Sequence, residues 1–408
     1  MTPAKGYTEM KDSGIQWIGQ IPTHWLLKKA KYCVSITNGS DPKSEGSVPV
    51  YGSGSESFKT CGEYKEGPAV LIGRKGATLH IPHYIEGRYW NVDTAFDVKP
   101  QEDFSLRYYY YLACVFDYNY YISQTTLPGM TQTNYNNMKL PCPSLDEQTA
   151  IASYLDAQCA KIDEIIAQAK ASIEDYKQWK ASIIYEAVTK GLNPNVEMKD
   201  SGIEWIGKIP KQWGTKQIRY LFELRDERND LPLEQVNLIS LYTDLGVVQH
   251  SDLEKITGNK AVTADGYKQV YPNDIVVNII LCWMGAIGMS NYAGVTSPAY
   301  DVYKPKDSQV TLSKYYHYLF RTARFNGKCY TVGRGIMAMR WRTYSSEFRA
   351  IKVPVPSYKT QVQIVEYLDS VCSKIDDLIS EKQSLIDNLE SYKKSLIYEV
   401  VTGKRRVV

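Results

Sequence analysis

The sequence has few of the features that mark secreted, membrane or metal-binding proteins. Its eight cysteines form no Cys-x-x-Cys pair and have no histidine at a zinc-site spacing, which argues against zinc and disulfide frameworks. No apolar run approaches the ~20 residues that a membrane helix needs, and the first residues lack the apolar core of a secretory signal. We therefore expect a cytoplasmic protein with no membrane partner and no bound metal.

Motifs of nucleotide-dependent and DNA-modifying enzymes are also missing. The string nearest to the Asn/Asp-Pro-Pro-aromatic motif of adenine methyltransferases, at 193–195, lacks the second proline and the aromatic residue. No Gly-x-x-x-x-Gly-Lys-Ser/Thr loop is present to bind nucleotide phosphates. Asp41, Glu63 and Lys65 formally match a nuclease set, but such loose spacing is common by chance, and an autonomous DNA-cleaving enzyme stays open only as an alternative. We expect no catalytic residue and no cofactor in this chain.

What is present is a long chain of ordinary globular composition. Its 408 residues are 43% hydrophobic and 23% charged, enough for two or three domains. The net charge of +3 is too small by itself to indicate a nucleic-acid partner. The arrangement of segments is therefore more informative than the totals.

An internal duplication organises the chain. Residues 10–25 return at 198–213 with 12 of 16 positions identical, and the segment from Leu140 returns from Val353. The first pair is offset by 188 residues and the second by 213, so the second copy holds 25 more residues between its repeated segments. The flanks are alike and the centres differ, which indicates one scaffold that carries two distinct recognition surfaces.

The two centres keep traces of a common fold. Residues 95–98 correspond to 299–302, and short β-rich runs lie between clusters of glycine, proline, asparagine and serine. This pattern predicts loop-rich modules of mixed α/β (α+β) type. A tyrosine-rich run at 108–111 is expected to pack one helical face into the core rather than to stack on bases.

Long helices follow each module. Apolar residues recur at three- and four-residue steps after each Pro-Ser pair, and Gly191 and Gly403 follow as stop signals. A helix over 146–190 would be roughly 65 Å long. Its single apolar stripe could pack on its own module, but two near-identical helices favour antiparallel coiled-coil packing with pseudo-two-fold symmetry. The predicted division is module 1 at 1–145, a helix at 146–190, a linker and module 2 at 191–352, and a second helix segment at 353–408.

This order of parts resembles the specificity subunit of type I restriction-modification systems over essentially the whole chain. The match is carried by a Pro-x-Pro-Ser approach and by polar and aromatic residues that recur in both helices. The resemblance implies that these repeated residues contact methyltransferase subunits: Gln148, Tyr154, Asp156, Lys161, Gln361, Tyr367, Asp369 and Lys374.

The resemblance also implies partners and a division of labour. Each module would be a target recognition domain that reads one half of an asymmetric, bipartite site on double-stranded DNA, and the helices would set the spacer between the halves. Two methyltransferase subunits and motor-nuclease subunits would complete the complex. S-adenosylmethionine, ATP and Mg²⁺ would belong to those partners.

The basic charge lies where a DNA-binding surface would need it. From 314 to 352 the chain has nine Lys or Arg residues against one acid, and arginine both neutralises phosphates and reads guanine edges. In module 1 the matching place is rich in amides, which favour adenine. A solvated basic face, and a coiled-coil adaptor without a DNA role, stay open as alternatives. The predicted DNA contacts are Arg74, Lys75, Gln132, Asn134, Tyr135, Arg324, Arg334, Arg340 and Arg342.

Overall fold

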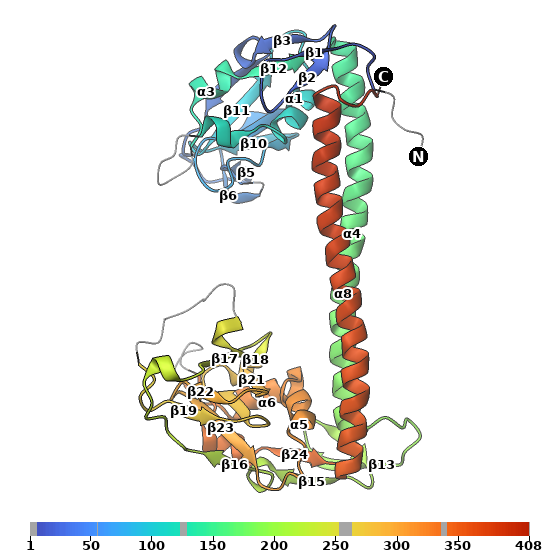
Figure 1. Cartoon of the computed structure of the whole chain (residues 1–408). Helices are drawn as coiled ribbons and strands as arrows, with labels where there is room; N and C mark the ends of the chain where they lie inside the picture. Colours follow the sequence, from blue (N-terminus) through green and yellow to red (C-terminus); the bar gives the residue numbers. More distant parts are fainter. Residues whose placement is uncertain (1–5, 55, 123–128, 253–262, 336–340, 408) are drawn as a thin grey trace. The chain divides into compact units, whose positions relative to one another are not determined.

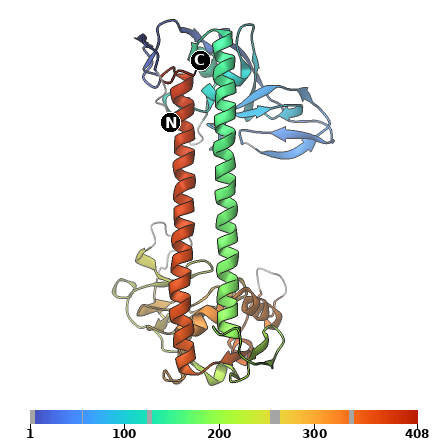
Figure 2. The same ribbon diagram turned by 90° about the vertical axis from the view of Figure 1, so that its right-hand side faces the viewer.

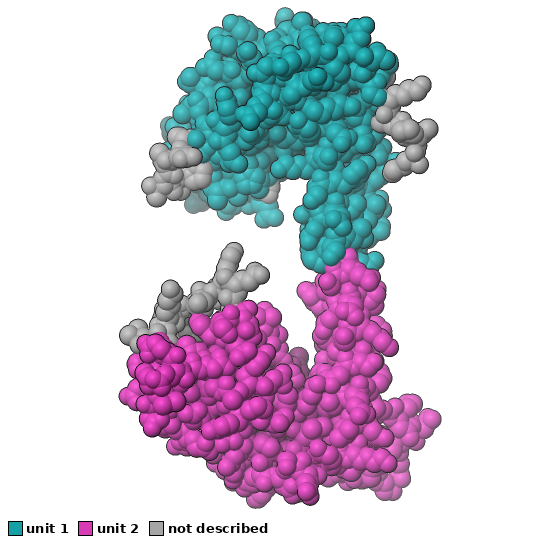
Figure 3. Space-filling view, in the orientation of Figure 1, with its two compact units in different colours: residues 1–171, 382–408 teal, residues 172–381 magenta. Residues whose placement is uncertain are grey.

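The computed structural model describes residues 6–54, 56–122, 129–252, 263–335 and 341–407. Contacts divide the chain into two compact units: unit 1 comprises residues 1–171 and 382–408, and unit 2 comprises residues 172–381 (Figure 3). Each unit holds one module together with parts of both long helices.

The module of unit 1 is built on a four-stranded antiparallel sheet of order β4-β11-β8-β9 (Figure 1). A second sheet has the order β6-β5-β10-β7, and β1-β2 and β3-β12 form two-stranded ribbons. The strands are β1 (Met10–Asp12), β2 (Gln20–Pro22), β3 (Leu26–Lys29), β4 (Val34–Asn38), β5 (Val48–Tyr51), β6 (Ser57–Cys61), β7 (Lys65–Glu66), β8 (Ala69–Gly73), β9 (His83–Ile85), β10 (Arg88–Asn91), β11 (Ala95–Pro100) and β12 (Lys139–Cys142). The short helices are η1 (Ala30–Tyr32), α1 (Leu106–Ala113), α2 (Tyr118–Tyr121) and α3 (Gln132–Asn137).

The module of unit 2 repeats this frame with the sheet order β16-β23-β20-β21 and the ribbons β13-β14 and β15-β24. In place of the second sheet it has two further ribbons, β17-β18 and β19-β22. The strands are β13 (Met198–Ile203), β14 (Gly207–Pro210), β15 (Gly214–Gln217), β16 (Phe222–Arg225), β17 (Ile239–Tyr242), β18 (Gly246–Gln249), β19 (Lys268–Val270), β20 (Ile275–Asn278), β21 (Ile287–Met289), β22 (Gly294–Thr296), β23 (Tyr300–Pro305) and β24 (Lys352–Val355). The short helices are η2 (Ile218–Tyr220), η3 (Leu233–Gln235), η4 (His250–Asp252), η5 (Cys282–Met284), α5 (Ser313–Phe320), α6 (Ala323–Val332) and α7 (Ser345–Ala350).

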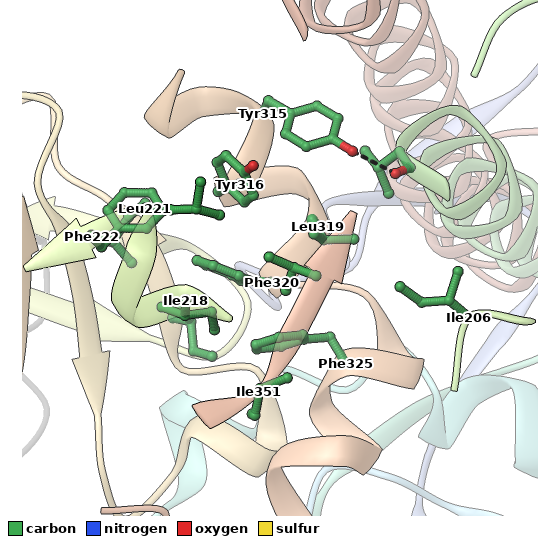
Figure 4. Close-up of a cluster of buried hydrophobic side chains, with 14 of the residues drawn as sticks. Ile206, Ile218, Leu221, Phe222, Tyr315, Tyr316, Leu319, Phe320, Phe325 and Ile351 are labelled. Atoms are coloured by element: carbon green, nitrogen blue, oxygen red, sulfur yellow. Dashed lines mark hydrogen bonds between the residues drawn. The ribbon is translucent and has the colours of Figure 1, made fainter. Parts of the chain in front are cut away.

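The central strands β8 and β20 are buried along their whole length, because they lie inside their sheets and are covered on both faces. In unit 2, helices α5, α6 and α7 contribute aromatic side chains to one core cluster, which includes Phe348. Tyr316, Phe320 and Phe325 of this cluster are shown in Figure 4. The tyrosine run of α1 is likewise buried, since Tyr108, Tyr109 and Tyr111 are at most 3% exposed. The prediction that this run packs into the core is confirmed.

The two long helices are α4 (Leu145–Lys190) and α8 (Tyr358–Val401). The Ser144 hydroxyl accepts the Glu147 N–H at 3.3 Å, and the Ser357 hydroxyl accepts the Thr360 N–H at 3.3 Å, so a serine caps each helix start. Gly191 at φ 77° follows the end of α4, a backbone region that glycine tolerates best. The predicted start and stop signals are confirmed.

Within each unit, the stretches of α4 and α8 run antiparallel, side by side (Figure 2). In unit 1 the Lys393 ammonium contacts the Asp163 carboxylate at 2.7 Å, and in unit 2 Lys180 contacts Asp376 at 2.6 Å. Because the second pair repeats the first with the helices exchanged, the two units use the same packing. The α+β fold with long antiparallel helices is confirmed. Among the described helices, none is long and apolar enough to cross a bilayer.

Candidate nucleic-acid interface

In unit 1, the structure brings together two segments that the sequence singled out separately. The chain leaves β8 at Arg74, whose carbonyl accepts the Met130 N–H at 2.9 Å, and Lys75 forms a β-bridge with Gly129. The Tyr135 hydroxyl donates to the Gly73 carbonyl at 2.8 Å. The residues after β8 and the residues before α3 therefore form one continuous surface.

Arg74 and Lys75 present cationic groups on this surface. The Arg74 guanidinium donates to the Asp93 carbonyl at 3.2 Å, and both cations lie 3.9 Å from the Asp93 carboxylate. The Lys75 side chain is 54% exposed, and exposed ion pairs of this length are weak. Both side chains remain accessible to a phosphate or a base edge.

The amide residues of α3 have partners inside the module. The Gln132 side-chain amide donates to the Ile36 carbonyl at 2.5 Å, and the Asn134 amide donates to the Tyr121 carbonyl at 2.9 Å. Both side chains are only partly exposed, so adenine reading by these amides stays a prediction. Tyr135 is 0% exposed, and its prediction as a direct base contact is wrong, because its ring packs in the core and its hydroxyl bonds to the backbone.

In unit 2, the basic segment forms an equivalent surface. Arg334 and Arg342 pair through two backbone hydrogen bonds of 2.9 Å, and the Thr343 N–H donates to the Ile279 carbonyl, directly after β20, at 2.9 Å. The Arg342 side chain is exposed, and Arg334 forms an ion pair with Glu347. Arg340 lies outside the described residues.

Arg324 is placed differently from the two paired arginines. It lies at the start of α6, and its guanidinium stacks 4.7 Å from the ring centre of Tyr185 on α4. Arg334 follows the end of the same helix, so the two residues are separated by roughly 15 Å along the helix axis. The structure therefore does not bring Arg324 to the Arg334–Arg342 surface.

Two of the three residues of the nuclease alternative, Glu63 and Lys65, have other partners. The Glu63 carboxylate accepts the backbone N–H groups of Lys43 and Ser44. The Lys65 ammonium contacts Asp97 at 3.1 Å, and the Tyr89 hydroxyl donates to the same carboxylate at 2.8 Å. Over the described parts of the chain, no group of three or more His, Cys, Asp or Glu side chains is arranged to hold a metal.

Two of the predicted helix-surface residues are buried and form hydrogen bonds inside their units. Gln148 is 1% exposed and accepts the Ser105 N–H at 2.8 Å, and Gln361 is 0% exposed and accepts the Leu312 N–H at 2.9 Å. Each glutamine thus joins a long helix to the start of α1 or α5. Their prediction as docking residues is wrong, because a buried amide with internal partners presents no surface.

The repeated aspartates hold the modules on the helices. Asp156 accepts hydrogen bonds from Arg107 at 2.7 Å and Tyr111 at 2.5 Å. Asp369 accepts equivalent bonds from Lys314 at 2.6 Å and Tyr318 at 2.7 Å. Burial, together with the hydrogen bond to the carboxylate, raises the pKa of Tyr111 and of Tyr318. Both aspartates keep about 40% of their side-chain surface, at 40% and 39%.

The remaining predicted helix residues do lie at the surface. Lys161 and Lys374 are exposed, Tyr367 is 42% exposed, and Tyr154 is partly exposed. The sequence prediction missed a further repeated aromatic pair, Trp179 on α4 and Tyr392 on α8, which are 53% and 42% exposed. The two residues occupy equivalent positions in the repeat, and the sequence alone could have identified them from this equivalence.

Comparisons with known proteins agree with this architecture. The sequence matches the pattern of the type I restriction modification DNA specificity domain at residues 30–175 and again at 210–388. The chain is similar to a putative type I restriction enzyme specificity subunit of Haemophilus influenzae, at 21% identity over 345 residues that cover 81% of each chain. It is also 26% identical over 91 residues to the EcoprrI specificity subunit of Escherichia coli, which covers 22% of this chain and 23% of that protein.

A solved structure shares the fold. It is described as the structural basis of complex assembly and conformational transition of the type I R-M system. The two chains align with a TM-score of 0.68 and 12% identity, over 93% of this chain and 98% of that chain.

Proposed function

The chain belongs to the type I restriction modification DNA specificity family, and we propose that each of its modules reads one half of an asymmetric, bipartite site on double-stranded DNA. In this proposal the chain itself performs no catalysis. It selects the site at which its partner subunits act.

One observation carries the proposal. In both modules, the segment before a short helix is hydrogen-bonded to the backbone that follows a buried central strand. This segment places Gly129 beside Lys75 in module 1 and Arg342 beside Arg334 in module 2. Cationic and hydrogen-bonding side chains on a rigid frame suit contact with phosphates and base edges. Two different sets of side chains on one frame fit two different half-sites. The predicted contacts Gln132 and Asn134 remain candidates at the edge of the module 1 surface, and Arg324 remains a candidate away from the Arg334–Arg342 surface.

We propose that the long helices set the unspecified spacer between the half-sites. Helix α4 has 46 residues and α8 has 44, and both belong partly to each unit. A rise of about 1.5 Å per residue makes helix length a direct measure of separation.

The helix surfaces are also the proposed docking sites for two methyltransferase subunits. The residues that support docking are repeated and lie at the surface: Lys161, Tyr367 and Lys374 are exposed, Tyr154 is partly exposed, and Asp156 and Asp369 keep accessible edges. A duplicated surface fits two copies of one partner. The methyltransferase subunits would bind S-adenosylmethionine and methylate adenine N6, and motor-nuclease subunits would use ATP and Mg²⁺.

The test is methylome sequencing of cells that express the partner methyltransferase with and without this chain. A split, adenine-methylated motif that appears only when the chain is present is the expected result. If a stable complex forms and no new motif appears, the chain acts as an adaptor and the proposal fails.

A further inference from the structure

Gly129 and Arg342 occupy equivalent places in the two modules. Each stands three residues before a short helix, α3 or α7, and the two positions are related by the same 213-residue offset as the flanking repeat. The next residue donates its N–H to the carbonyl that follows the buried central strand: Met130 to Arg74, and Thr343 to Ile279. The residue after this position therefore has the same backbone partner in both modules, while the position itself bridges Lys75 in module 1 and Arg334 in module 2. It carries a side chain only in module 2.

The backbone at Arg342 is fixed by its neighbours. Trp341 stacks on Tyr330 with ring centres 5.0 Å apart and an interplanar angle of 25°, and its indole N–H donates to the Tyr330 carbonyl at 3.0 Å. On the other side, the Thr343 hydroxyl donates to the Cys329 carbonyl at 3.0 Å, and Thr343 is 0% exposed. Because both neighbouring residues are anchored, the backbone that carries Arg342 loses little freedom when the side chain binds, which favours precise recognition.

Two other arginines of module 2 have internal partners, whereas the Arg342 guanidinium has none among the described residues. Arg321 donates to four backbone carbonyls, and Arg334 is paired with Glu347. Among the described residues, no hydrogen bond, ion pair or ring contact engages the exposed Arg342 side chain. Its planar fork of donors matches the O6 and N7 acceptors of guanine in the major groove.

We propose that Arg342 reads a guanine in the half-site of module 2, with Trp341 as its positioning residue, and that position 129 is the corresponding specificity position of module 1. This inference rests on the function proposed above and names one base that the site contains. Glycine at 129 has no side chain that could contact a base. Among the described residues, a Cβ built there would meet only the Arg74 carbonyl oxygen, at 3.4 Å, so a Cβ fits with little adjustment.

The first test compares methylomes of cells that hold the complex with Arg342→Ala or Arg342→Lys. The guanine of one half-site should become degenerate, with its preference reduced by about 5- to 150-fold, while the other half-site keeps its sequence. Lysine should also relax the position, because it keeps the charge and lacks the bidentate fork. Arg219→Ala is the matched control: it removes an exposed arginine of the same module, on η2, and should leave the motif unchanged.

The second test adds an arginine side chain to module 1 at the position equivalent to Arg342. Gly129→Arg should introduce or strengthen a guanine preference in the half-site that Arg342→Ala leaves intact. Trp341→Ala should relax the same position as Arg342→Ala, and Trp341→Phe, which keeps a ring on Tyr330, should restore most of the preference. A purely structural role of Trp341 would lower the amount of complex without altering the motif.

Several outcomes overturn the inference. An unchanged motif with Arg342→Ala and Gly129→Arg, or changes by both variants in the same half-site, would contradict it. If Arg342→Ala abolishes methylation, binding of the purified complex to oligonucleotides at fixed salt decides: an equal loss for all sequences identifies a phosphate contact and overturns the proposal. If the unaltered chain directs no motif, the proposed function itself fails, which is a separate result.

Discussion

Buried charges in both modules serve the fold rather than DNA. The Lys268 ammonium contacts the Asp301 carboxylate at 2.9 Å, and the two side chains are only 8% and 12% exposed. The Tyr303 hydroxyl donates to the same carboxylate at 3.1 Å. Module 1 has the equivalent Lys65–Asp97 pair at 3.1 Å. A charged group in such a site is stable only while its counter-charge is present.

Replacement of Asp301 by asparagine should therefore be costly. The Lys268 ammonium would remain buried without a counter-charge, and we expect the free energy of unfolding to fall by about 3–5 kcal/mol, measured by urea unfolding. Glu66→Gln is the control, because the Arg88–Glu66 pair is 60% and 59% exposed and its loss should cost under about 1 kcal/mol. Equal effects of the two substitutions would contradict this account of the buried pair.

His317 gives unit 2 a pH-dependent stability. Burial, together with the positive charges of the nearby Arg321 and Lys314, lowers its pKa from 6.5 to about 4. Because its pKa is lower in the folded chain than in the unfolded one, its contribution to stability is complete above pH 6.5 and is lost as pH falls towards 4. His317→Gln should flatten the decline between these values by up to about 1.4 kcal/mol per pH unit, measured by urea unfolding at a series of pH values. Parallel curves for the two proteins would show that His317 is not the cause.

At the scale of the element, the two buried glutamines join the long helices to the modules. Gln361 accepts the Leu312 N–H and donates to the carbonyls of Val310 and Pro356 at 2.9 and 3.0 Å. Gln148 makes the corresponding bonds to Ser105 and Pro143 in unit 1. Each glutamine thus fixes the place at which its helix leaves the module.

Substitution of Gln361 tests this bracing. Gln361→Ala leaves the partly buried Leu312 N–H without its acceptor, and we expect unit 2 to lose about 1–3 kcal/mol of stability, seen as a lower unfolding midpoint. The matched control is Gln363→Ala, two residues further on the same helix, where the side chain is exposed and its loss should change the midpoint little. If Gln361→Ala lowers the unfolding midpoint no more than Gln363→Ala does, the hydrogen bonds of Gln361 do not stabilise unit 2.

Helix length has a predicted effect on the DNA site. Deletion of the equivalent seven-residue segments 165–171 and 378–384 keeps the packing face in register and shortens each helix by roughly 10 Å, about three base pairs of DNA. The methylome should then show the same half-sites with a shorter spacer. If the complex assembles and the spacer is unchanged, the helices do not set the distance between the half-sites.

The long helices were predictable because their signals are local. The three- and four-residue apolar steps, the serine caps and the glycines that follow are all present in the sequence. The burial of Gln148 and Tyr135 was not predictable, since a repeated polar or aromatic residue looks the same whether it faces solvent or a neighbouring element. Their partners, Ser105 and Gly73, lie 43 and 62 residues away in sequence.

At the scale of the whole molecule, an equivalent hydrogen bond joins the module to the end of a long helix in each unit. In unit 1 the Tyr108 hydroxyl donates to the Val401 carbonyl at 3.0 Å, and in unit 2 the Tyr315 hydroxyl donates to the Val188 carbonyl at 2.7 Å. The end of one long helix is thus bonded to the module of each unit. The duplication seen in the sequence predicted this equivalence of the units. It could not predict which loops would meet, because the joining of β8 to the segment before α3 depends on contacts between distant residues.

We propose that the two copies of the scaffold each read one half-site independently. The most direct measurement is the methylome of cells whose chain carries module 1 twice, with residues 198–355 replaced by residues 10–142. Because these segments begin and end at equivalent repeat positions, the account predicts a symmetric methylated motif whose halves both match the half-site of module 1. An asymmetric motif, or one that keeps the half-site of module 2, from a stably assembled complex would contradict it.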